Sequence, residues 1–139
     1  MNRKLLYLFL LVPLVMGSSP EQTAPRSLAE TFLAAVQKGE VSKAVDRLFE
    51  GSSIPKDKPQ AIGLLKKQAE IVLPLYGKLL GYELVKEERF GTSLVRLVYV
   101  LKAEKHLTVW EFYFYKPGTT WFVSNVNFND QFTLLGIRN

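Results

Sequence analysis

The fold is decided by the stretch Thr92–Phe128, TSLVRLVYVLKAEKHLTVWEFYFYKPGTTWFVSNVNF, which is dense in β-branched and aromatic residues. Two short polar segments interrupt it, one around Glu104 and one at Lys116–Thr119, and the second contains a Pro-Gly pair that is typical of tight turns. The pattern predicts three consecutive antiparallel strands, at 92–103, 107–115 and 120–128. Such a ribbon must bury at least one apolar face against other parts of the chain.

The alternation of side chains in this ribbon predicts two apolar faces. If both hairpin loops have an even length, the register fixes which residues share a face. One face then holds Val95, Leu97, Tyr99, Leu101, Trp110, Phe112, Phe114, Trp121 and Val123, and ends in Asn125 and Asn127. The opposite face holds Leu94, Arg96, Val98, Val100, Val109, Glu111, Tyr113, Tyr115, Phe122, Ser124, Val126 and Phe128.

In an antiparallel sheet with one solvent-exposed face, apolar and polar residues alternate more regularly than in this ribbon. We therefore expect both faces to be covered. Upstream helices can cover one face, and a second copy of the chain can cover the other. The sequence therefore predicts a homodimer that forms through a sheet face. The alternative is a strongly curved sheet that tolerates its outer aromatic residues singly.

The segment upstream of the ribbon is predicted to form three helices. The first begins at a capping box, Ser27-Leu28-Ala29-Glu30, and ends at Gly39. A second, shorter helix fits 40–50, and Ser and Pro residues then interrupt the helical pattern. The third and longest begins at Pro59, and Pro74 is expected to kink or end it. Its apolar stripe is predicted to be Ile62, Leu65, Ala69 and Val72, continued by Leu75, Tyr76, Leu79 and Leu80.

A first strand is predicted at Tyr82–Phe90, and its four consecutive charged residues, Lys86 to Arg89, suit the edge of a sheet. The predicted fold class is therefore α+β, with three N-terminal helices packed on a curved antiparallel sheet of about four strands. The chain has 139 residues and 47% hydrophobic residues, which is typical of one globular domain. We assign that domain to residues 27–139.

The N-terminus has the pattern of a signal peptide. A short basic start at residues 1–4 precedes an apolar run at 5–16 and a small residue, Gly17. The run is shorter than the roughly 20 residues that cross a bilayer, so no stable membrane span is expected after cleavage. We predict a signal peptide at 1–17, a flexible leader at 18–26, and export to the periplasm or the medium. The chain contains no Cys, so it has neither a disulfide framework nor a cysteine for lipid attachment.

The charge pattern argues against nucleic acid as a partner. The net charge is +5, and it falls to +3 if Arg3 and Lys4 leave with the signal peptide. The remaining basic residues alternate with Glu instead of gathering on one face. No cofactor motif and no metal-ligand spacing is evident. His106, the sole histidine, is interpreted as a solvated residue of a hairpin turn.

Four polar residues on the second ribbon face form the candidate site. Under the register above, Arg96 lies diagonally across from Glu111, with Tyr113 and Ser124 beside them. Convergent polar groups between apolar walls are typical of a ligand-binding pocket, in which Glu111 is the candidate catalytic acid or base. The alternative is an ordinary cross-strand ion pair on a half-exposed face.

The order of these elements resembles the nuclear transport factor 2-like superfamily. The resemblance is carried by YGKLLGYE (76–83) after the third helix, by WEFYFYKPG (110–118) and by WFV (121–123). It implies a cone-shaped fold in which a curved sheet wraps a long helix, often encloses a pocket and commonly dimerises through the sheet. Catalytic members use an Asp or His with a Tyr in that pocket. This chain has no histidine in its presumed sheet interior and no strand Asp before Asp130, so those catalytic residues do not carry over.

Two functions follow as hypotheses. The first is an exported, non-catalytic module that binds a small apolar ligand or a protein partner in the cell envelope. The second is an isomerase- or dehydratase-like enzyme that uses Glu111, Arg96 and Tyr113.

Overall fold

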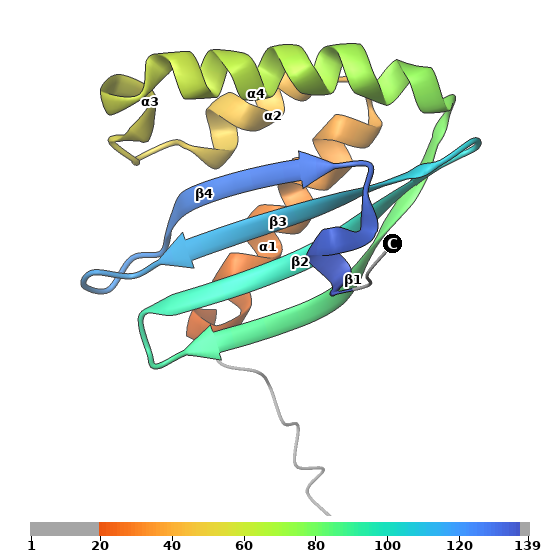
Figure 1. Ribbon diagram of the computed structural model, residues 1–139. Coiled ribbons are helices and arrows are strands. Elements are labelled where there is room, and N and C mark those ends of the chain that lie inside the picture. Colours follow the sequence, from red (N-terminus) through yellow and green to blue (C-terminus); the bar gives the residue numbers. More distant parts are fainter. Residues whose placement is uncertain (1–19, 137–139) are drawn as a thin grey trace, which may run out of the picture.

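The structure is a computed structural model that describes residues 20–136; the predicted signal peptide at 1–17 lies outside this range. Helices come first and strands second, so the α+β class is confirmed (Figure 1). The helical elements are α1 (Pro20–Gln37), α2 (Val41–Leu48), α3 (Ile54–Asp57), α4 (Pro59–Val72) and the 3-10 helix η1 (Leu73–Tyr76). The strands are β1 (Leu79–Phe90), β2 (Leu94–Ala103), β3 (Leu107–Tyr115) and β4 (Phe122–Asn129), and the 3-10 helix η2 (Phe132–Leu135) follows them.

The first helix begins earlier than the sequence predicted. It starts at Pro20 and runs through Ser27, so the predicted capping box is wrong and its Glu30 lies inside the helix. With 18 residues, α1 also exceeds the 14 of α4, which we had predicted to be the longest helix. Pro25 removes one backbone hydrogen bond from the helix, and the residue is buried. Glu30 instead accepts a hydrogen bond from the Tyr99 hydroxyl, at 3.0 Å.

The predicted helical hairpin of α1 and α2 is confirmed. Gly39 joins the two helices with a φ of +80°, in the left-handed region that glycine adopts at no steric cost. The apolar side of α2 is buried, through Val41, Ala44, Val45 and Leu48. The short helix α3 occupies the segment where the sequence predicted an interruption.

The long helix from Pro59 ends as its proline predicted. Its α-helical part stops at Val72, and the chain continues through Pro74 as the 3-10 turn η1. The predicted apolar stripe does not stay buried beyond this point, because Leu75 and Leu80 are 63% and 56% exposed. A 3-10 turn rotates further per residue than an α-helix, and this difference turns Leu75 away from the core.

The strands form one open antiparallel sheet in the order β1-β2-β3-β4, with β1 at an edge as predicted. The predicted facing of β2 and β3 is confirmed. Leu97 lies opposite Phe112, and Tyr99 lies opposite Trp110, so their side chains share one face. β1 begins at Leu79, three residues earlier than predicted.

β4 carries a bulge at Ser124, where its pairing with β3 shifts register. Beyond the bulge, Val126 and Phe128 lie on the helix side of the sheet, and Asn125 and Asn127 lie on the other side. The predicted faces of these four side chains are therefore wrong, because the extra residue reverses the alternation that the sequence pattern predicts.

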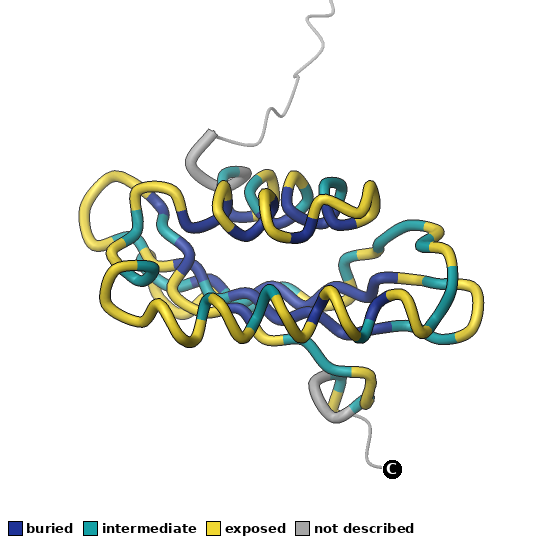
Figure 2. Tube along the Cα trace, turned by 90° about the horizontal axis from the view of Figure 1, so that it is seen from above, coloured by how far each residue is buried: buried dark blue, intermediate teal, exposed yellow. Residues whose placement is uncertain are grey.

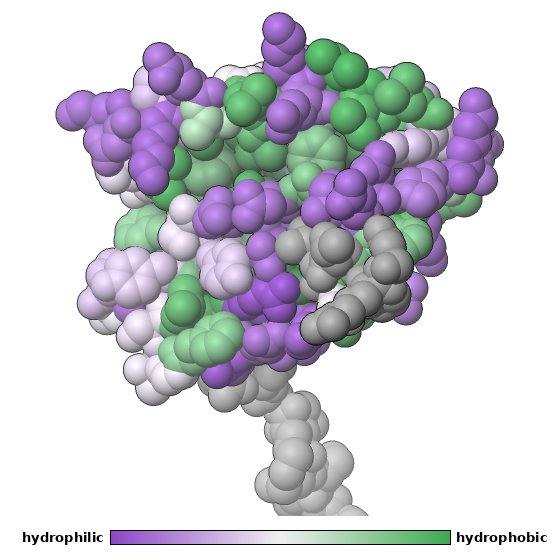
Figure 3. All heavy atoms as spheres, viewed as in Figure 1, coloured by the Kyte–Doolittle hydropathy of each residue, from purple (hydrophilic) through white to green (hydrophobic). Residues whose placement is uncertain are grey.

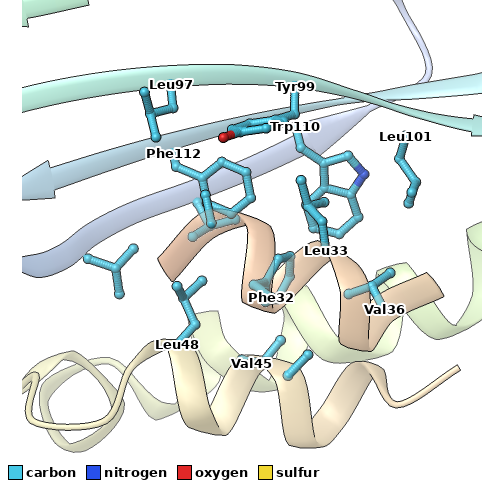
Figure 4. Close-up of a cluster of buried hydrophobic side chains, with 14 of the residues drawn as sticks. Phe32, Leu33, Val36, Val45, Leu48, Leu97, Tyr99, Leu101, Trp110 and Phe112 are labelled. Carbon is cyan, nitrogen blue, oxygen red and sulfur yellow. The ribbon is translucent and has the colours of Figure 1, made fainter. Parts of the chain in front are cut away.

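The main core lies between the sheet and the helices α1 and α2. The side chains of Tyr99, Trp110 and Phe112 are fully buried there. The Phe32 ring of α1 packs edge-on against Trp110 and Phe112, with ring centroids 5.3 and 5.6 Å apart (Figure 4). This interior is therefore filled by aromatic side chains. Figure 2 shows the buried segments of the strands and of α1 facing each other.

We call the face of the sheet that turns away from α1 and α2 the open face. The C-terminal turn η2 covers one part of it, on the other side of the sheet from α1 (Figures 1 and 2). Phe132 and Leu135 pack there against Val98, Val100 and Val109. The chain itself thus covers part of the surface that the sequence analysis left to a second copy.

Candidate functional site

A row of charged and polar side chains crosses the open face from strand to strand. We call it the polar band; its members are Lys86, Glu88, Arg96, Glu111 and Asn127. Every strand contributes at least one member. The band therefore includes Arg96 and Glu111, around which the sequence predicted a site.

The register of the sheet brings these residues together. Glu88 lies opposite Arg96 across β1 and β2, and Glu111 lies opposite Asn127 across β3 and β4. Arg96 faces Tyr113 directly, so Glu111 is its diagonal neighbour, as predicted. Side chains at alternate positions of a strand share a face, so all of these groups lie on the open face.

The ion pairs of the band form a continuous chain. Arg96 donates from Nε to Glu111 Oε2 at 2.5 Å and from Nη1 to Glu88 Oε1 at 2.8 Å. Lys86 Nζ lies 2.8 Å from the same Glu88 oxygen. The Nδ2 of Asn127 approaches Glu111 Oε1 at 3.5 Å. Both oxygens of Glu111 thus have partners, which hold the carboxylate in place.

Burial and charge act on the band in opposite directions. Burial opposes the charge of Arg96, but the hydrogen bond to Glu111 and the negative charge of that residue outweigh it and raise the pKa of Arg96. The hydrogen bond from Lys86, helped by the charges of Lys86 and Arg96, lowers the pKa of Glu88. The band is therefore a set of mutually neutralised charges.

Three of the four predicted site residues come together, and one does not. Arg96, Glu111 and Tyr113 are neighbours on the open face. Ser124 is the bulge residue of β4 and lines a surface hollow of about 320 Å³ on the other side, beside α4. Its predicted place in the site is wrong because the bulge turns it away.

Three members of the band lie outside the site that the sequence predicted. The sequence pattern predicted Lys86 and Glu88 only as charged residues of an edge strand. It gave no indication that they would form ion pairs with side chains of the neighbouring strand. Asn127 was placed on the wrong face. The spacing of Val123 and Val126 by three residues, instead of two, was the signal for a bulge that would have placed it correctly.

An aromatic patch adjoins the polar band on the open face. It consists of Phe90, Leu94, Tyr113 and Tyr115 (Figure 3, in pale and green atoms beside the purple band). Leu94 lies opposite Phe90 on one side and Tyr115 on the other, so these three form a cross-strand row. Phe90 is 49% exposed and Tyr115 is 47% exposed. The patch thus offers aromatic surface to solvent.

At the other end of the open face, His106 contacts Tyr76, Asp130 and Phe132. The Tyr76 hydroxyl donates to the Asp130 carboxylate, and His106 Nε2 lies 2.9 Å from the Asp130 carbonyl oxygen. The His106 ring lies between those of Tyr76 and Phe132, at 5.1 and 5.8 Å. His106 does lie in a hairpin turn, but it is half-buried, so its interpretation as a solvated residue is wrong. The hydrogen bond to Asp130, and then burial, raises the pKa of Tyr76.

Surface hollows occur on the helix side of the molecule. One of about 430 Å³ lies where the end of α1 and the start of α2 meet α4. Buried apolar residues line it, among them Val36, Val41, Ala69 and Leu73. Lys38 and Lys78 also line it. Its size suits a small apolar ligand.

Within residues 20–136, no helix is long and apolar enough to span a membrane, and no three acidic or histidine side chains gather into a group that could hold a metal ion. No protein-family model matches the chain, and neither does any curated protein or solved structure.

Proposed function

We propose that the protein is an exported, non-catalytic module that binds a protein partner in the cell envelope through the aromatic patch and the adjoining polar band. The observation that carries this proposal is the cross-strand row of Phe90, Leu94 and Tyr115, whose two aromatic members are exposed, with Tyr113 next to it. Tyr, Phe and Arg are enriched where protein interfaces gain most of their affinity.

The polar band supports this function by its rigidity. Arg96 is already anchored by Glu88 and Glu111 before any partner arrives. Arg96 therefore loses little further side-chain entropy when a partner packs against the band, and the fixed charges favour one orientation over others. A band of this kind suits the rim of a binding surface, with the aromatic patch as its centre.

The geometry favours binding over catalysis at Glu111. A general base needs an oxygen that can reach a substrate proton, whereas both Glu111 oxygens have protein partners. The isomerase- or dehydratase-like alternative, with Glu111, Arg96 and Tyr113, is tested by Glu111→Gln. This near-isosteric change removes the base and would abolish an activity, but it leaves the aromatic patch intact.

Export and fold complete the proposal. The basic start, apolar run and Gly17 at the N-terminus support export through a cleaved signal peptide. The order of the helices followed by an antiparallel meander supports a relationship to the nuclear transport factor 2-like superfamily. In that group a sheet face commonly mediates dimerisation, so a second copy of the chain is one partner that the open face can take.

Site-specific photo-crosslinking tests the proposal. A photoreactive phenylalanine analogue replaces Tyr115 or Phe90 in cells that export the protein, and Thr31, exposed on α1, serves as the matched control. We expect a discrete adduct with another protein from positions 115 and 90 and none from 31, and we expect Leu94→Asp to remove it. Adducts of twice the mass of the chain would assign the patch to self-association. Equal labelling from all three positions would refute the proposed binding surface.

A small apolar ligand is the second candidate function, and the hollow between α1, α2 and α4 favours it. Its apolar floor and its volume of about 430 Å³ suit a compact ligand. Ala69→Trp would fill that hollow without touching the open face. Retained binding of a hydrophobic reporter dye by this variant would argue against the hollow as a ligand site.

A further inference from the structure

Side-chain contacts hold the turn η2 on the open face. Phe132 and Leu135 pack there on three valines of β2 and β3, which are Val98, Val100 and Val109. Among residues 20–136, no backbone hydrogen bond joins η2 to a strand. Each strand, by contrast, is paired with its neighbour along a backbone ladder. The turn η2 can therefore leave its place without breaking the sheet.

The contacts that hold η2 are also partly open to solvent. Phe132 and Leu135 both remain partly exposed. Just before the turn, Asp130 accepts a hydrogen bond from the Tyr76 hydroxyl and contacts His106, and both contacts are exposed. Hydrogen bonds that compete with water contribute little net free energy. Opening of η2 should thus need less free energy than unfolding of the whole protein.

The docked turn divides the open face into a covered end and an exposed end. At the covered end the three valines are at most 7% exposed, whereas Phe90 and Tyr115 at the other end are nearly half exposed. The polar band lies between the two ends, since its Glu111 pairs with Val98 across β2 and β3. Without η2, the open face would be a single surface that is apolar at both ends and polar across its middle.

The exposed end alone is small for a stable protein complex. A standard interface buries about 800 Å² on each partner. Of the four side chains of the aromatic patch, only Phe90 and Tyr115 are exposed, each by about half. A large aromatic side chain buries roughly 150–250 Å² in full, so these two supply roughly 200 Å² between them. A tight complex on the open face therefore requires the end that η2 covers.

We propose that η2 is an autoinhibitory cover, and that the protein partner displaces it from the three valines when it binds. The inference rests on the proposed function of the aromatic patch and adds regulation of the same surface. Docking of η2 and binding of the partner exclude each other at the valines, so weaker docking raises the apparent affinity for the partner. The polar band suits burial in the complex, because Arg96 and Glu111 neutralise each other and both Glu111 oxygens already have partners.

Thiol labelling of the full chain measures whether η2 opens by itself. The chain has no Cys, so a single cysteine reports on one position. Val98→Cys lies beneath η2, and Val95→Cys, on the helix side of the same strand, is the matched control, since both valines are buried. We expect iodoacetamide to modify Val98→Cys at least about tenfold faster than Val95→Cys, because only Val95 requires the core to unfold. Equal rates would overturn the proposal.

A core substitution separates local opening from global unfolding in the same assay. Val45 of α2 is buried on the helix side of the sheet, in a region that stays packed when η2 opens. Val45→Ala should therefore speed the labelling of Val95→Cys by about fivefold or more and leave that of Val98→Cys nearly unchanged. An equal increase at both cysteines would mean that η2 opens only when the whole protein unfolds, which contradicts the proposal.

Photo-crosslinking in cells tests the competition with the partner. With the photoreactive analogue at position 115, Phe132→Ala should raise the yield of the adduct per folded chain by about threefold or more. Leu135→Ala removes less of the packing and should act in the same direction. Leu64→Ala shortens an exposed side chain of α4 and is the control that should leave the yield unchanged.

The outcomes at position 115 separate this proposal from the function on which it rests. An adduct whose yield is the same in the parent and in both η2 variants would overturn the autoinhibitory role and leave the binding surface in place. A higher yield in the η2 variants but not in Leu64→Ala would support the cover. If neither the parent nor an η2 variant formed an adduct, the binding surface itself would be refuted, and the cover with it.

Discussion

Arg96 Nε lies 2.5 Å from Glu111 Oε2 on neighbouring strands, and only 14% and 9% of these two side chains are exposed. An ion pair with so little solvent around it is not an ordinary surface contact. Removing water from both charges opposes folding, and their attraction offsets this only while both partners are present. Loss of one partner should therefore be worse than loss of both.

Glu111→Gln should lower the free energy of unfolding by about 1–3 kcal/mol. The value stays moderate because Arg96 keeps Glu88 as a partner. Replacement of the whole pair, Arg96→Met with Glu111→Leu, should be closer to neutral than the sum of the single changes. Urea unfolding of the double-mutant cycle measures this coupling. Lys86→Met, at the exposed end of the band, is the control and should change stability by less than about 0.5 kcal/mol. Additive single changes would contradict the expected coupling.

Tyr99 makes stability fall at alkaline pH. Burial, and then the hydrogen bond to Glu30, raises the pKa of Tyr99 above its unfolded value of about 10. The stabilisation from its neutral phenol is complete below about pH 10, the unfolded pKa. It is lost as the pH rises from there through the pKa of Tyr99 in the folded protein. Tyr99→Phe should lower stability by about 1 kcal/mol at pH 8 but show a smaller further loss between pH 9 and pH 11. Urea unfolding across this range measures both effects.

Tyr115→Phe is the matched control for this change. Its side chain is exposed on the open face, so the variant should keep the alkaline loss of the parent. If Tyr99→Phe and the parent lose stability in parallel above pH 9, the assignment of that loss to Tyr99 is wrong.

The sequence predicted the parts of the sheet whose pairing is regular. In β2 and β3, side chains alternate without interruption, so the faces of Leu97, Tyr99 and Trp110 follow from a period of two. The diagonal contact of Arg96 with Glu111 follows from the same period. The helical hairpin also followed from local signals, because Gly39 ends α1 through a backbone conformation that other residues disfavour.

What the sequence did not predict depends on contacts between distant residues. The bulge at Ser124 is one extra residue in β4, which the spacing of Val123 and Val126 signals, but the place of Val126 and Phe128 in the core is established only by their packing in the folded chain. Likewise, α1 starts at Pro20, before the predicted capping box, and its Pro25 is buried in the folded chain. Phe132 covers part of the open face because η2 folds back onto the sheet, and no periodic pattern in the sequence predicts this. Local propensity yields to tertiary packing in each case.

Gly77 and Gly63 should respond in opposite directions to alanine. Gly77 has a φ of +82°, and a Cβ there would lie 2.7 Å from the Glu104 carboxylate. Gly77→Ala should therefore lower the free energy of unfolding by about 1–2 kcal/mol or more. Gly63 lies within α4 with nothing near its Cβ position, so Gly63→Ala should raise stability by about 0.5–1 kcal/mol. Urea unfolding of both variants measures this, and a loss at both positions would contradict it.

Phe132 and Phe90 lie at opposite ends of the open face and should differ in what they stabilise. Phe132 packs on the cluster of Val98, Val100 and Val109, whereas Phe90 is half exposed in the aromatic patch. Phe132→Ala should thus lower the free energy of unfolding by about 1–3 kcal/mol and expose that cluster to a hydrophobic dye. Phe90→Ala should change stability by less than about 0.5 kcal/mol while weakening crosslinking at Tyr115. Equal losses in the free energy of unfolding for the two variants would contradict this prediction, because the packing of η2 on the sheet would then stabilise the fold no more than the aromatic patch does.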